Sequence, residues 1–519
     1  MRAADLPLYY NAVDILERNL AERADKVALY SDERTVTFAQ MSSAVNQVGN
    51  GLRELGVGHG DHVVVLSLDG PDWVAAFFGT LKIGAVAASL NTLLTAREYA
   101  YIFRDCRASV AFVHAMILPK LLEVRGELPH LRHIVVIGGP TDPAAGVVGF
   151  REWIVDKPTM LEAEATHRED ICCLNYSSGT TGEPKGILHA HKDLPLTAQL
   201  WGVNVLGLGE SDRTFAVAKL FFTFGTGGNL IFPWYAGASV VLYPGPPAAA
   251  ANVLRHIEQY RPTILYNAPT GYSMLLAMDD LTTAHDLSSL RLCVSAGESL
   301  PAPIWHAWKE RTGLDIIDGI GSTENYHIFI SNRPGDIRPG SSGKPFEGYG
   351  LRIVDEAGAD VAPGEVGNLL VRGETASLAY LHQYARSQQT FLGEWLNTGD
   401  KYRVDPDGYY WHCGRSDDML KVGGIWVSPV EVESALLGHE AVLECAVIGQ
   451  ADERDLVKPK AFVVVREGFE AGEDLERALI AHCRDHMAEY KRPRWIVFVP
   501  GLPKTATGKI QRFRLRNLK

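Results

Sequence analysis

The feature that most restricts the fold of this chain is an alternation of short apolar runs with stretches of helical periodicity before residue 410. Residues 36–55 and 73–83 repeat apolar side chains at helical spacing, whereas the run from Val63 to Leu66 is short and continuous, which is typical of a buried strand. Further strands are predicted at 134–137, 240–242, 263–266 and 291–295, each followed by Gly, Pro or Asn. Strands that alternate with helices predict an α/β fold with mainly parallel, buried strands.

Length and turn signals predict how the chain divides. With 519 residues it is too long for one hydrophobic core. Turn signals at 355–358, 363–364 and 405–408 mark a β-rich piece over 351–410. After residue 415 a separate α+β pattern begins, with strands expected at 442–448 and 459–465 and a helix at 475–486. We predict a large N-terminal domain of α/β sheets with a small β-rich subdomain (1–415), and a small α+β C-terminal domain (416–519).

Composition excludes several classes of protein. Fifty Lys and Arg against 62 Asp and Glu give a net charge of −12, so no nucleic-acid partner is expected. The longest apolar stretch, 73–90, is interrupted by Lys82 and two glycines, and a membrane span needs about 18 uninterrupted apolar residues. The N-terminus lacks a hydrophobic signal core. Seven cysteines without a C-x-x-C pair favour a reducing cytoplasm and no structural zinc. We therefore expect a cytoplasmic protein without a membrane partner.

One loop carries the residue types that bind phosphate. Residues 176–186 read Tyr-Ser-Ser-Gly-Thr-Thr-Gly-Glu-Pro-Lys-Gly, directly after an apolar run. Glycines let backbone N–H groups approach a polyphosphate, hydroxyls add donors, and Lys185 adds a positive charge. The loop is not a Walker motif, because Pro184 stands at the second glycine position and Gly186 at the Mg²⁺-binding hydroxyl position. The alternative is an exposed flexible loop, since Gly, Ser and Thr often cluster in turns.

Four further motifs follow in a fixed order. They are Asp-Gly-Ile-Gly-Ser-Thr-Glu at 318–324, Leu-Asn-Thr-Gly-Asp at 396–400, Gly-Arg-Ser-Asp-Asp-Met-Leu-Lys-Val-Gly-Gly at 414–424, and Pro-Lys-Thr-Ala-Thr-Gly-Lys at 503–509. Together with the phosphate loop they resemble the adenylate-forming superfamily, which contains acyl- and aryl-CoA synthetases, adenylation domains of peptide synthetases, and luciferases. The resemblance covers nearly the whole chain. It implies activation of a carboxylic acid with ATP and Mg²⁺, and a C-terminal domain that is mobile.

The resemblance assigns roles around the nucleotide. The β- and γ-phosphates would be held by the loop residues Ser177, Ser178, Gly179, Thr180, Thr181, Gly182 and Lys185. Glu324 would be the Mg²⁺ ligand, in a motif that also places Asp318, Gly319 and Thr323 at the nucleotide. Gly297 and Glu298 would lie along the adenine. Asp400 would accept both ribose hydroxyls, with Arg415 assisting at the ribose and phosphate.

The C-terminal part carries the groups that would change places during the reaction. Lys509 resembles the family lysine whose ammonium stabilises negative charge during adenylation; with Glu324, Thr180 and Lys185 it completes the expected catalytic set. Asp417 resembles the hinge about which the small domain turns. Rotation of the small domain would then present Gly423 and Gly424 for thioester formation, because a coenzyme A pantetheine arm can pass close to the backbone there.

The amino-acid sequences of two segments indicate the class of carboxylic acid that is activated. Residues 320–329 and the segment Lys-Leu-Phe-Phe-Thr-Phe-Gly at 219–225 look like benzoate–CoA ligases. The expected acid pocket consists of Phe222, Thr223, Phe224, Tyr266, Tyr326 and His327. Benzoate ligases carry Ala and Tyr at the positions of Thr223 and Phe224, so an amino- or hydroxybenzoate is a plausible substrate. The alternative for any one of these aromatic residues is a place in the core.

Three classes of function fit the motifs. The first is an aryl-CoA ligase that acts on a small aromatic acid and coenzyme A, as a monomer or a homodimer. The second is a stand-alone adenylation enzyme that loads a separate carrier protein, which shares the pantetheine arm. The third, a non-catalytic binding protein, is disfavoured because the expected nucleotide residues are intact.

Overall fold

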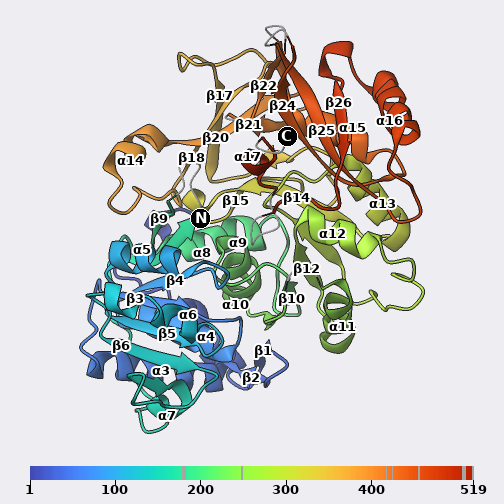
Figure 1. Cartoon of the computed structure of the whole chain (residues 1–519). Coiled ribbons are helices and arrows are strands. Elements are labelled where there is room, and N and C mark those ends of the chain that lie inside the picture. Colours follow the sequence, from blue (N-terminus) through green and yellow to red (C-terminus); the bar gives the residue numbers. More distant parts are fainter. Residues whose placement is uncertain are drawn as a thin grey trace.

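The computed structural model describes residues 1–177, 183–246, 249–416, 418–422, 425–453, 456–504 and 510–516. Figure 1 shows two N-terminal layers, a β-rich part beside them and a C-terminal sheet at the upper right. The first layer is a seven-stranded sheet with the order β7 (Val147–Gly149), β6 (His133–Ile137), β5 (Val110–His114), β3 (His62–Leu66), β4 (Val86–Ser89), β8 (Ile171–Ser177) and β9 (Lys185–Ala190). All its neighbours are parallel except β8 and β9, which form an antiparallel pair.

The second layer is a nine-stranded sheet. Its order is β16 (Lys344–Pro345), β15 (Ile328–Ser331), β14 (Ile316–Gly321), β13 (Leu292–Ser295), β12 (Ile264–Asn267), β10 (Arg213–Ala216), β11 (Ser239–Val241), β1 (Val27–Tyr30) and β2 (Val36–Thr37). The central strands from β1 to β14 are parallel, and the strands at both edges are antiparallel. The prediction of mainly parallel, buried strands is confirmed.

The main core lies between these two sheets. It is filled by side chains of α1 (Asp14–Glu17), α3 (Phe38–Glu54), α4 (Pro71–Lys82), α7 (Phe150–Ile154), α8 (Asp193–Thr197) and α10 (Phe232–Tyr235). The side chain of Thr37 caps α3 by accepting the N–H of Gln40. Every residue of α4 is buried, so the apolar stretch 73–90 consists of a core helix followed by the buried strand β4. No described helix is long and apolar enough to cross a membrane.

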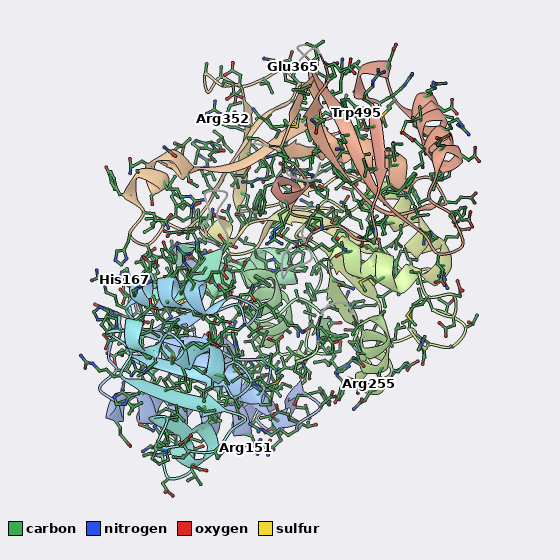
Figure 2. All side chains as sticks on the ribbon, in the orientation of Figure 1. Arg151, His167, Arg255, Arg352, Glu365 and Trp495 are labelled. Atoms are coloured by element: carbon green, nitrogen blue, oxygen red, sulfur yellow. The ribbon has the colours of Figure 1, made fainter. Side chains whose placement is uncertain are left out.

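Helices also cover the outer faces of both sheets. The seven-stranded sheet is covered by α5 (Ala96–Cys106) and α6 (Leu118–Leu122), and the nine-stranded sheet by α11 (Ala250–Tyr260), α12 (Pro269–Leu276) and α13 (Ala302–Thr312). Charged side chains such as Arg151, Arg255 and Glu365 point outward at the periphery (Figure 2). Because helices bury both faces of each sheet, the sequences of the strands are continuous apolar runs.

The β-rich subdomain is a separate antiparallel sheet with its own small core. It contains β17 (Tyr349–Val354), β18 (Gly367–Gly373), β20 (Trp395–Val404), β19 (Phe391–Leu392) and β21 (Tyr410–Arg415), with α14 (Tyr384–Thr390) before β19. Its position agrees with the predicted β-rich piece at 351–410. The sheet brings Asp400 on β20 directly opposite Arg415 on β21.

The C-terminal part has a three-stranded sheet of β24 (Val442–Ala451), β25 (Val457–Val465) and β26 (Trp495–Phe498). One face packs on α15 (Pro429–Leu437) and α16 (Glu473–His486), and the other on α17 (Arg512–Leu515). A hairpin of β22 (Leu420–Val422) and β23 (Ile425–Val427) precedes α15. The two strands and the helix that the sequence predicted here are confirmed. The division at 415/416 and the mobility of this part remain predictions.

Candidate active site

The predicted site residues gather where parallel strands end. The segment after β10 leads to Thr223, the segment after β13 contains Gly297 and Glu298, and the segment after β14 contains Glu324. Ser177 ends β8 and pairs with Lys185 at the start of β9, so the two described ends of the phosphate loop lie side by side in an antiparallel pair. The carboxyl ends of strands are where open α/β sheets bind ligands, because loops and backbone N–H groups converge there.

Lys185 and Glu324 form the polar centre of the site. The ammonium of Lys185 lies 2.5 Å from Glu324 Oε1, and the hydroxyl of Tyr380 donates to the same oxygen at 2.8 Å. Burial alone would raise the pKa of the Glu324 carboxyl, but the Lys185 charge and the two hydrogen bonds outweigh it and hold that pKa below its usual value. Glu324 is therefore an ionised, oriented carboxylate at neutral pH.

This carboxylate fits the role expected for an Mg²⁺ ligand. Mg²⁺ is usually held by one or two carboxylates together with waters and substrate phosphates. Within the described residues no group of three or more His, Cys, Asp or Glu side chains is placed to hold a metal. A single ionised Glu324 beside the phosphate loop fits a cation that arrives with a polyphosphate, and Glu324 would hold that cation.

The turn that carries Glu324 begins with Asp318 and Gly319 on β14 and contains Thr323 in the short helix η5 (Thr323–Asn325). Gly319 lies directly against β15, where an added Cβ would stand 2.6 Å from a backbone oxygen, so its role is close packing. Asp318 is buried, and burial raises the pKa of its carboxyl to about 8. Asp318 is therefore mainly protonated at neutral pH in the ligand-free protein.

The ribose site expected at Asp400 is assembled from two chain segments. Arg415 Nη1 lies 3.3 Å from Asp400 Oδ1, and His412 Nε2 lies 3.5 Å from the same oxygen. The other ring nitrogen of His412 is 2.7 Å from the hydroxyl of Ser299, next to Glu298. The residues expected at the ribose are thus connected to the segment expected at the adenine.

An aromatic cluster lies beside this polar centre. Tyr266 packs edge-on against Phe224 with ring centroids 5.8 Å apart, and His327 lies 5.0 Å from Trp201 and 4.6 Å from Phe232. Two glycines of the π-helical turn η4 (Gly227–Ile231) form part of the wall. A Cβ on Gly227 would stand 2.6 Å from the His327 ring, and one on Gly228 would stand 2.7 Å from the Tyr266 ring. Backbone without side chains therefore approaches both rings closely.

Polar atoms inside this cluster lack partners among the described residues. They are the hydroxyl of Tyr266, the indole nitrogen of Trp201 and Nδ1 of His327. His327 Nε2 lies 3.4 Å from the carbonyl oxygen of Phe224, which only accepts, so Nε2 carries the hydrogen and Nδ1 is left as an acceptor. Burial lowers the pKa of the His327 imidazole to about 3, which keeps the ring neutral.

Two residues expected in the acid pocket make their ring contacts outside this aromatic cluster. Tyr326 packs edge-on against His189, with ring centroids 5.1 Å apart, rather than against His327 beside it in the sequence. Its φ of +67° turns the chain between the two residues. Phe222 lies 4.4 Å from Phe221. The structure therefore brings Phe224, Tyr266 and His327 together, with Thr223 directly before Phe224 in the chain, but does not bring Tyr326 and Phe222 into that ring cluster.

Nine of the expected site residues lie outside the described residues. These are Ser178, Gly179, Thr180, Thr181, Gly182, Asp417, Gly423, Gly424 and Lys509. Their roles remain predictions from the motifs.

Sequence reasoning missed several residues that the fold brings to the site. Tyr380 reaches Glu324 because its segment runs beside β9, where the N–H of Leu381 donates to the carbonyl of Gly186. No motif surrounds Tyr380 in the sequence. His412 carried a weak signal, since it stands three positions before Arg415. Trp201 gave none beyond its apolar character.

Comparison with known proteins decides the family. The AMP-binding enzyme family matches residues 16–381, and the AMP-binding enzyme C-terminal domain matches residues 431–509. This chain belongs to the AMP-binding enzyme family.

Relatives within the family share nearly the full length. A benzoate–CoA ligase from Thauera aromatica is 46% identical over 99% of this chain and 97% of its own. A 4-hydroxybenzoate–CoA/benzoate–CoA ligase from Rhodopseudomonas palustris is 41% identical over 98% of this chain and 94% of its own. Among solved structures, the anthranilate CoA ligase AuaEII in complex with anthranoyl-AMP is 65% identical, covers 100% of this chain and 98% of its own, and superposes with a TM-score of 0.97. The predicted resemblance to adenylate-forming enzymes of the benzoate–CoA ligase type is confirmed.

Proposed function

We propose that this protein is an AMP-forming aromatic acid–CoA ligase whose preferred acid is 2-aminobenzoate. In the first half-reaction the carboxylate attacks the α-phosphate of ATP, which gives aryl-AMP and pyrophosphate. In the second, the thiol of coenzyme A attacks the carbonyl carbon of aryl-AMP, which gives aryl-CoA and AMP. Full-length similarity to benzoate–CoA and hydroxybenzoate–CoA ligases supports the reaction class.

The observation that carries the choice of acid is the neutral His327 ring in the aromatic cluster. Its Nδ1 is a buried acceptor without a described partner, and a ring amino group ortho to the carboxylate is a donor. Plain benzoate would leave this acceptor unpaired, which costs about 1–3 kcal/mol. The 65% identity to an anthranilate CoA ligase supports the same choice, since anthranilate is 2-aminobenzoate.

The remaining site residues take the following roles in this proposal. Lys185 and the rest of the phosphate loop bind the polyphosphate, and Glu324 holds the Mg²⁺ that would neutralise phosphate charge. Asp400 accepts the ribose hydroxyls, with Arg415 and His412 fixing its carboxylate. Lys509 supplies positive charge during adenylation, and residues 423–424 pass the pantetheine arm. These roles rest on motif positions and, for the described residues, on the contacts given above.

Domain movement and cell compartment are part of the proposal. The two family matches leave residues 382–430 between them, a gap that contains the expected boundary at 415/416 and the expected hinge Asp417.

All seven cysteines are free and buried, which supports a reducing compartment such as the cytoplasm.

A substrate panel tests the proposal. Purified protein with ATP, Mg²⁺ and coenzyme A is assayed with benzoate, 2-aminobenzoate, 2-hydroxybenzoate and 4-aminobenzoate, the last as a control for the position of the amino group. We expect AMP and pyrophosphate as products and a kcat/KM for 2-aminobenzoate about 5–150-fold above that for benzoate, because one buried acceptor gains a donor. Equal values for benzoate and 2-aminobenzoate would reject the acid. Release of ADP, or transfer only to a phosphopantetheinyl carrier protein, would reject the reaction.

A further inference from the structure

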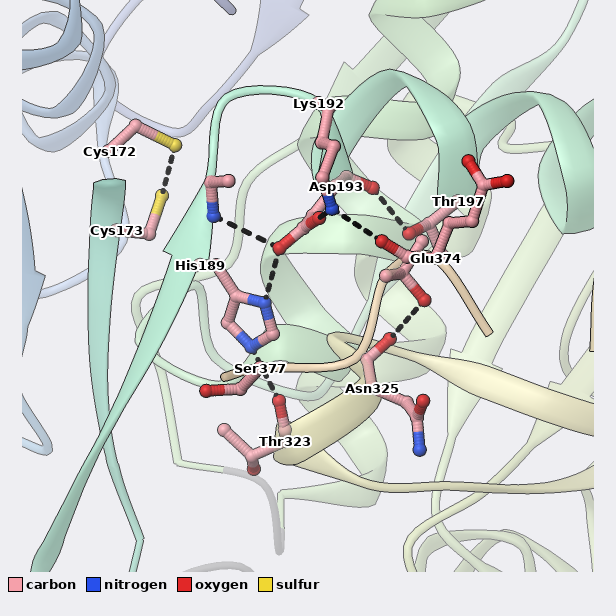
Figure 3. Close-up of polar contacts among 12 residues, drawn as sticks. Cys172, Cys173, His189, Lys192, Asp193, Thr197, Thr323, Asn325, Glu374 and Ser377 are labelled. Atoms are coloured by element: carbon pink, nitrogen blue, oxygen red, sulfur yellow. Dashed lines mark hydrogen bonds and ion pairs between the residues drawn. The ribbon is translucent and has the colours of Figure 1, made fainter. Parts of the chain in front are cut away.

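A second polar network reaches the turn of Glu324 from the same strand as Lys185. His189 lies four residues after Lys185 on β9, so the two side chains share one side of the strand. Its Nδ1 is 3.0 Å from Asp193 Oδ2, and its Nε2 is 2.6 Å from the carbonyl oxygen of Thr323 (Figure 3). The His189 side chain is 0% exposed and that of Asp193 is 3% exposed.

Both atoms that face the His189 ring accept hydrogen bonds. The Thr323 carbonyl has no hydrogen to donate. The Asp193 carboxylate also accepts the N–H of Ala190 at 3.0 Å and the ammonium of Lys192 at 3.0 Å, as an ionised acceptor does. The contacts therefore describe a buried imidazole held between a carboxylate and a backbone carbonyl.

The turn that receives this contact needs support from outside. Tyr326, which follows it, has a φ of +67°, a costly conformation for a residue with a side chain. Each carbonyl of 323–325 accepts from another segment: that of Thr323 from His189, that of Glu324 from the N–H of Ser377 at 2.7 Å, and that of Asn325 from the hydroxyl of Thr375 at 3.2 Å. These donors hold the backbone on both sides of the Glu324 side chain.

Asp193 connects the two supporting segments. Besides orienting His189, it contacts Lys192, whose ammonium also donates to the carbonyl of Glu374 at 2.5 Å. Residues 374–377 then carry the donors to Glu324 and Asn325. A single buried carboxylate thus anchors both groups of donors that fix the turn, as Figure 3 shows.

We propose that His189 is a positioning residue for adenylation: held by Asp193, it fixes the Thr323 carbonyl and thereby the direction of the Glu324 carboxylate. This rests on the proposed function, in which Glu324 binds the Mg²⁺ of ATP. His189 itself touches neither acid nor nucleotide. Its effect falls on the half-reaction that uses Mg–ATP and not on thioester formation.

Variants of His189 test this division. His189→Leu removes both ring nitrogens at similar volume, whereas His189→Gln keeps an N–H that can reach Thr323. His191→Leu is the matched control, because His191 is equally buried but its Nδ1 accepts the N–H of Ala12 at 3.0 Å instead. Three quantities are measured: ATP–pyrophosphate exchange with 2-aminobenzoate and benzoate, thioester formation from supplied aryl-AMP, and Mg–ATP affinity by calorimetry without acid.

We expect His189→Leu to lower exchange about 10–100-fold and to weaken Mg–ATP binding, as loss of an outer partner of a metal ligand does. Thioester formation should be unchanged, and His189→Gln should recover part of the exchange. His191→Leu should keep wild-type exchange. Equal loss in both half-reactions, or equal loss in the His189→Leu and His191→Leu variants, would show that His189 merely supports the fold and would overturn the proposal.

A spectroscopic measurement keeps the proposal testable if the Leu variants do not fold. In a long-range ¹H–¹⁵N spectrum of wild-type protein, the ring N–H of one histidine should exchange slowly with water, as a buried donor to a carbonyl does, and should be absent from the His189→Gln spectrum. Failure to find it would overturn the contact between His189 and Thr323 and with it the proposal. If wild-type protein activates none of the aromatic acids, the proposed function fails, and Mg–ATP affinity together with this spectrum still decides the role of His189.

Discussion

At the scale of single residues, neighbours decide which carboxyl groups are charged. Glu324 and Asp318 belong to one motif and are both buried. The ammonium of Lys185, 2.5 Å away, keeps Glu324 ionised, whereas no cation among the described residues contacts Asp318 in the same way. One Asp318 oxygen, Oδ1, also lacks a partner among the described residues. The two carboxyls therefore suit different tasks: Glu324 attracts a cation, and Asp318 remains a neutral polar group.

Asp318→Asn should make the pH dependence of stability less steep. Because burial raises the folded-state pKa of Asp318 to about 8, above its unfolded value, the folded protein holds a proton that the unfolded chain releases between about pH 4 and 8. The contribution of Asp318 to the free energy of unfolding is fully present below pH 4. It falls as pH rises, by at most about 1.4 kcal/mol per pH unit in that window. Asn cannot ionise, so the variant should gain stability relative to wild type at pH 9 and gain less at pH 5.

Denaturant unfolding of ligand-free wild type and Asp318→Asn at pH 5, 7 and 9 measures this difference. A difference in unfolding free energy that is the same at all three pH values would show that Asp318 is ionised throughout.

At the scale of elements, a π-helical turn forms part of the wall of the aromatic cluster that we propose as the acid pocket. The segment from α9 (Thr223–Thr226) through η4 to α10 is one helical stretch whose π turn contains Gly227 and Gly228. The extra residue of a π turn rotates the following side chains, and such turns often occur at functional sites. Here it places bare backbone against the rings of His327 and Tyr266.

Gly227→Ala should disturb the choice of acid more than the fold. Its Cβ would stand 2.6 Å from the His327 ring and 2.8 Å from the Phe232 ring, so the imidazole must move. Overpacking of this kind costs about 1–3 kcal/mol, and kcat/KM for 2-aminobenzoate should fall about 5–150-fold, more than for benzoate.

Steady-state kinetics with both acids measure the Gly227→Ala effect. Gly209→Ala is the control, because its Cβ would meet nothing within 4 Å. A parallel fall for the two acids would mean that His327 does not select the ring substituent.

At the scale of the whole molecule, residues on both sides of the segment that contains Lys509 form ion pairs with the C-terminal part. On one side the ammonium of Lys504 lies 2.5 Å from Glu444 on β24. On the other, Arg512 donates to both carboxylate oxygens of Glu433 on α15, each at 2.8 Å. Burial alone would lower the pKa of the Arg512 guanidinium, but Glu433 and Asp418 outweigh it and raise that pKa. Lys504 and Arg512, which flank the segment with Lys509, are therefore both attached to the C-terminal part by ion pairs.

Lys509→Ala should suppress aryl-AMP formation and leave thioester formation from supplied aryl-AMP largely intact. The loss of one oriented charge at the reacting phosphate should cost about 10²–10³ in rate. Single-turnover assays of each half-reaction measure the split, with Lys504→Ala as the control for loss of a nearby lysine. Equal losses in both half-reactions would contradict the proposed division between the two faces of the domain.

The sequence alone determined the elements and predicted the residues of the proposed nucleotide site. Continuous apolar runs predict buried parallel strands, because both faces of these sheets are covered, and β3, β6, β12 and β13 lie where such runs occur. Lys185, Glu324, Asp400 and Arg415 were identifiable because their motifs are local in sequence. The residues 178–182, 417, 423–424 and 509 remain predictions from the same motifs.

Only the tertiary structure decided which side chains act together. Tyr380 lies 56 residues from Glu324 and carries no motif, yet its hydroxyl donates to that carboxylate because its segment runs beside β9. Tyr326 and His327 are adjacent and similar in character, but the positive φ of Tyr326 directs one ring toward His189 and the other toward Trp201. Local patterns depend on period and spacing along the chain, whereas these contacts depend on how separate strands and turns meet, which is determined by packing over the whole domain.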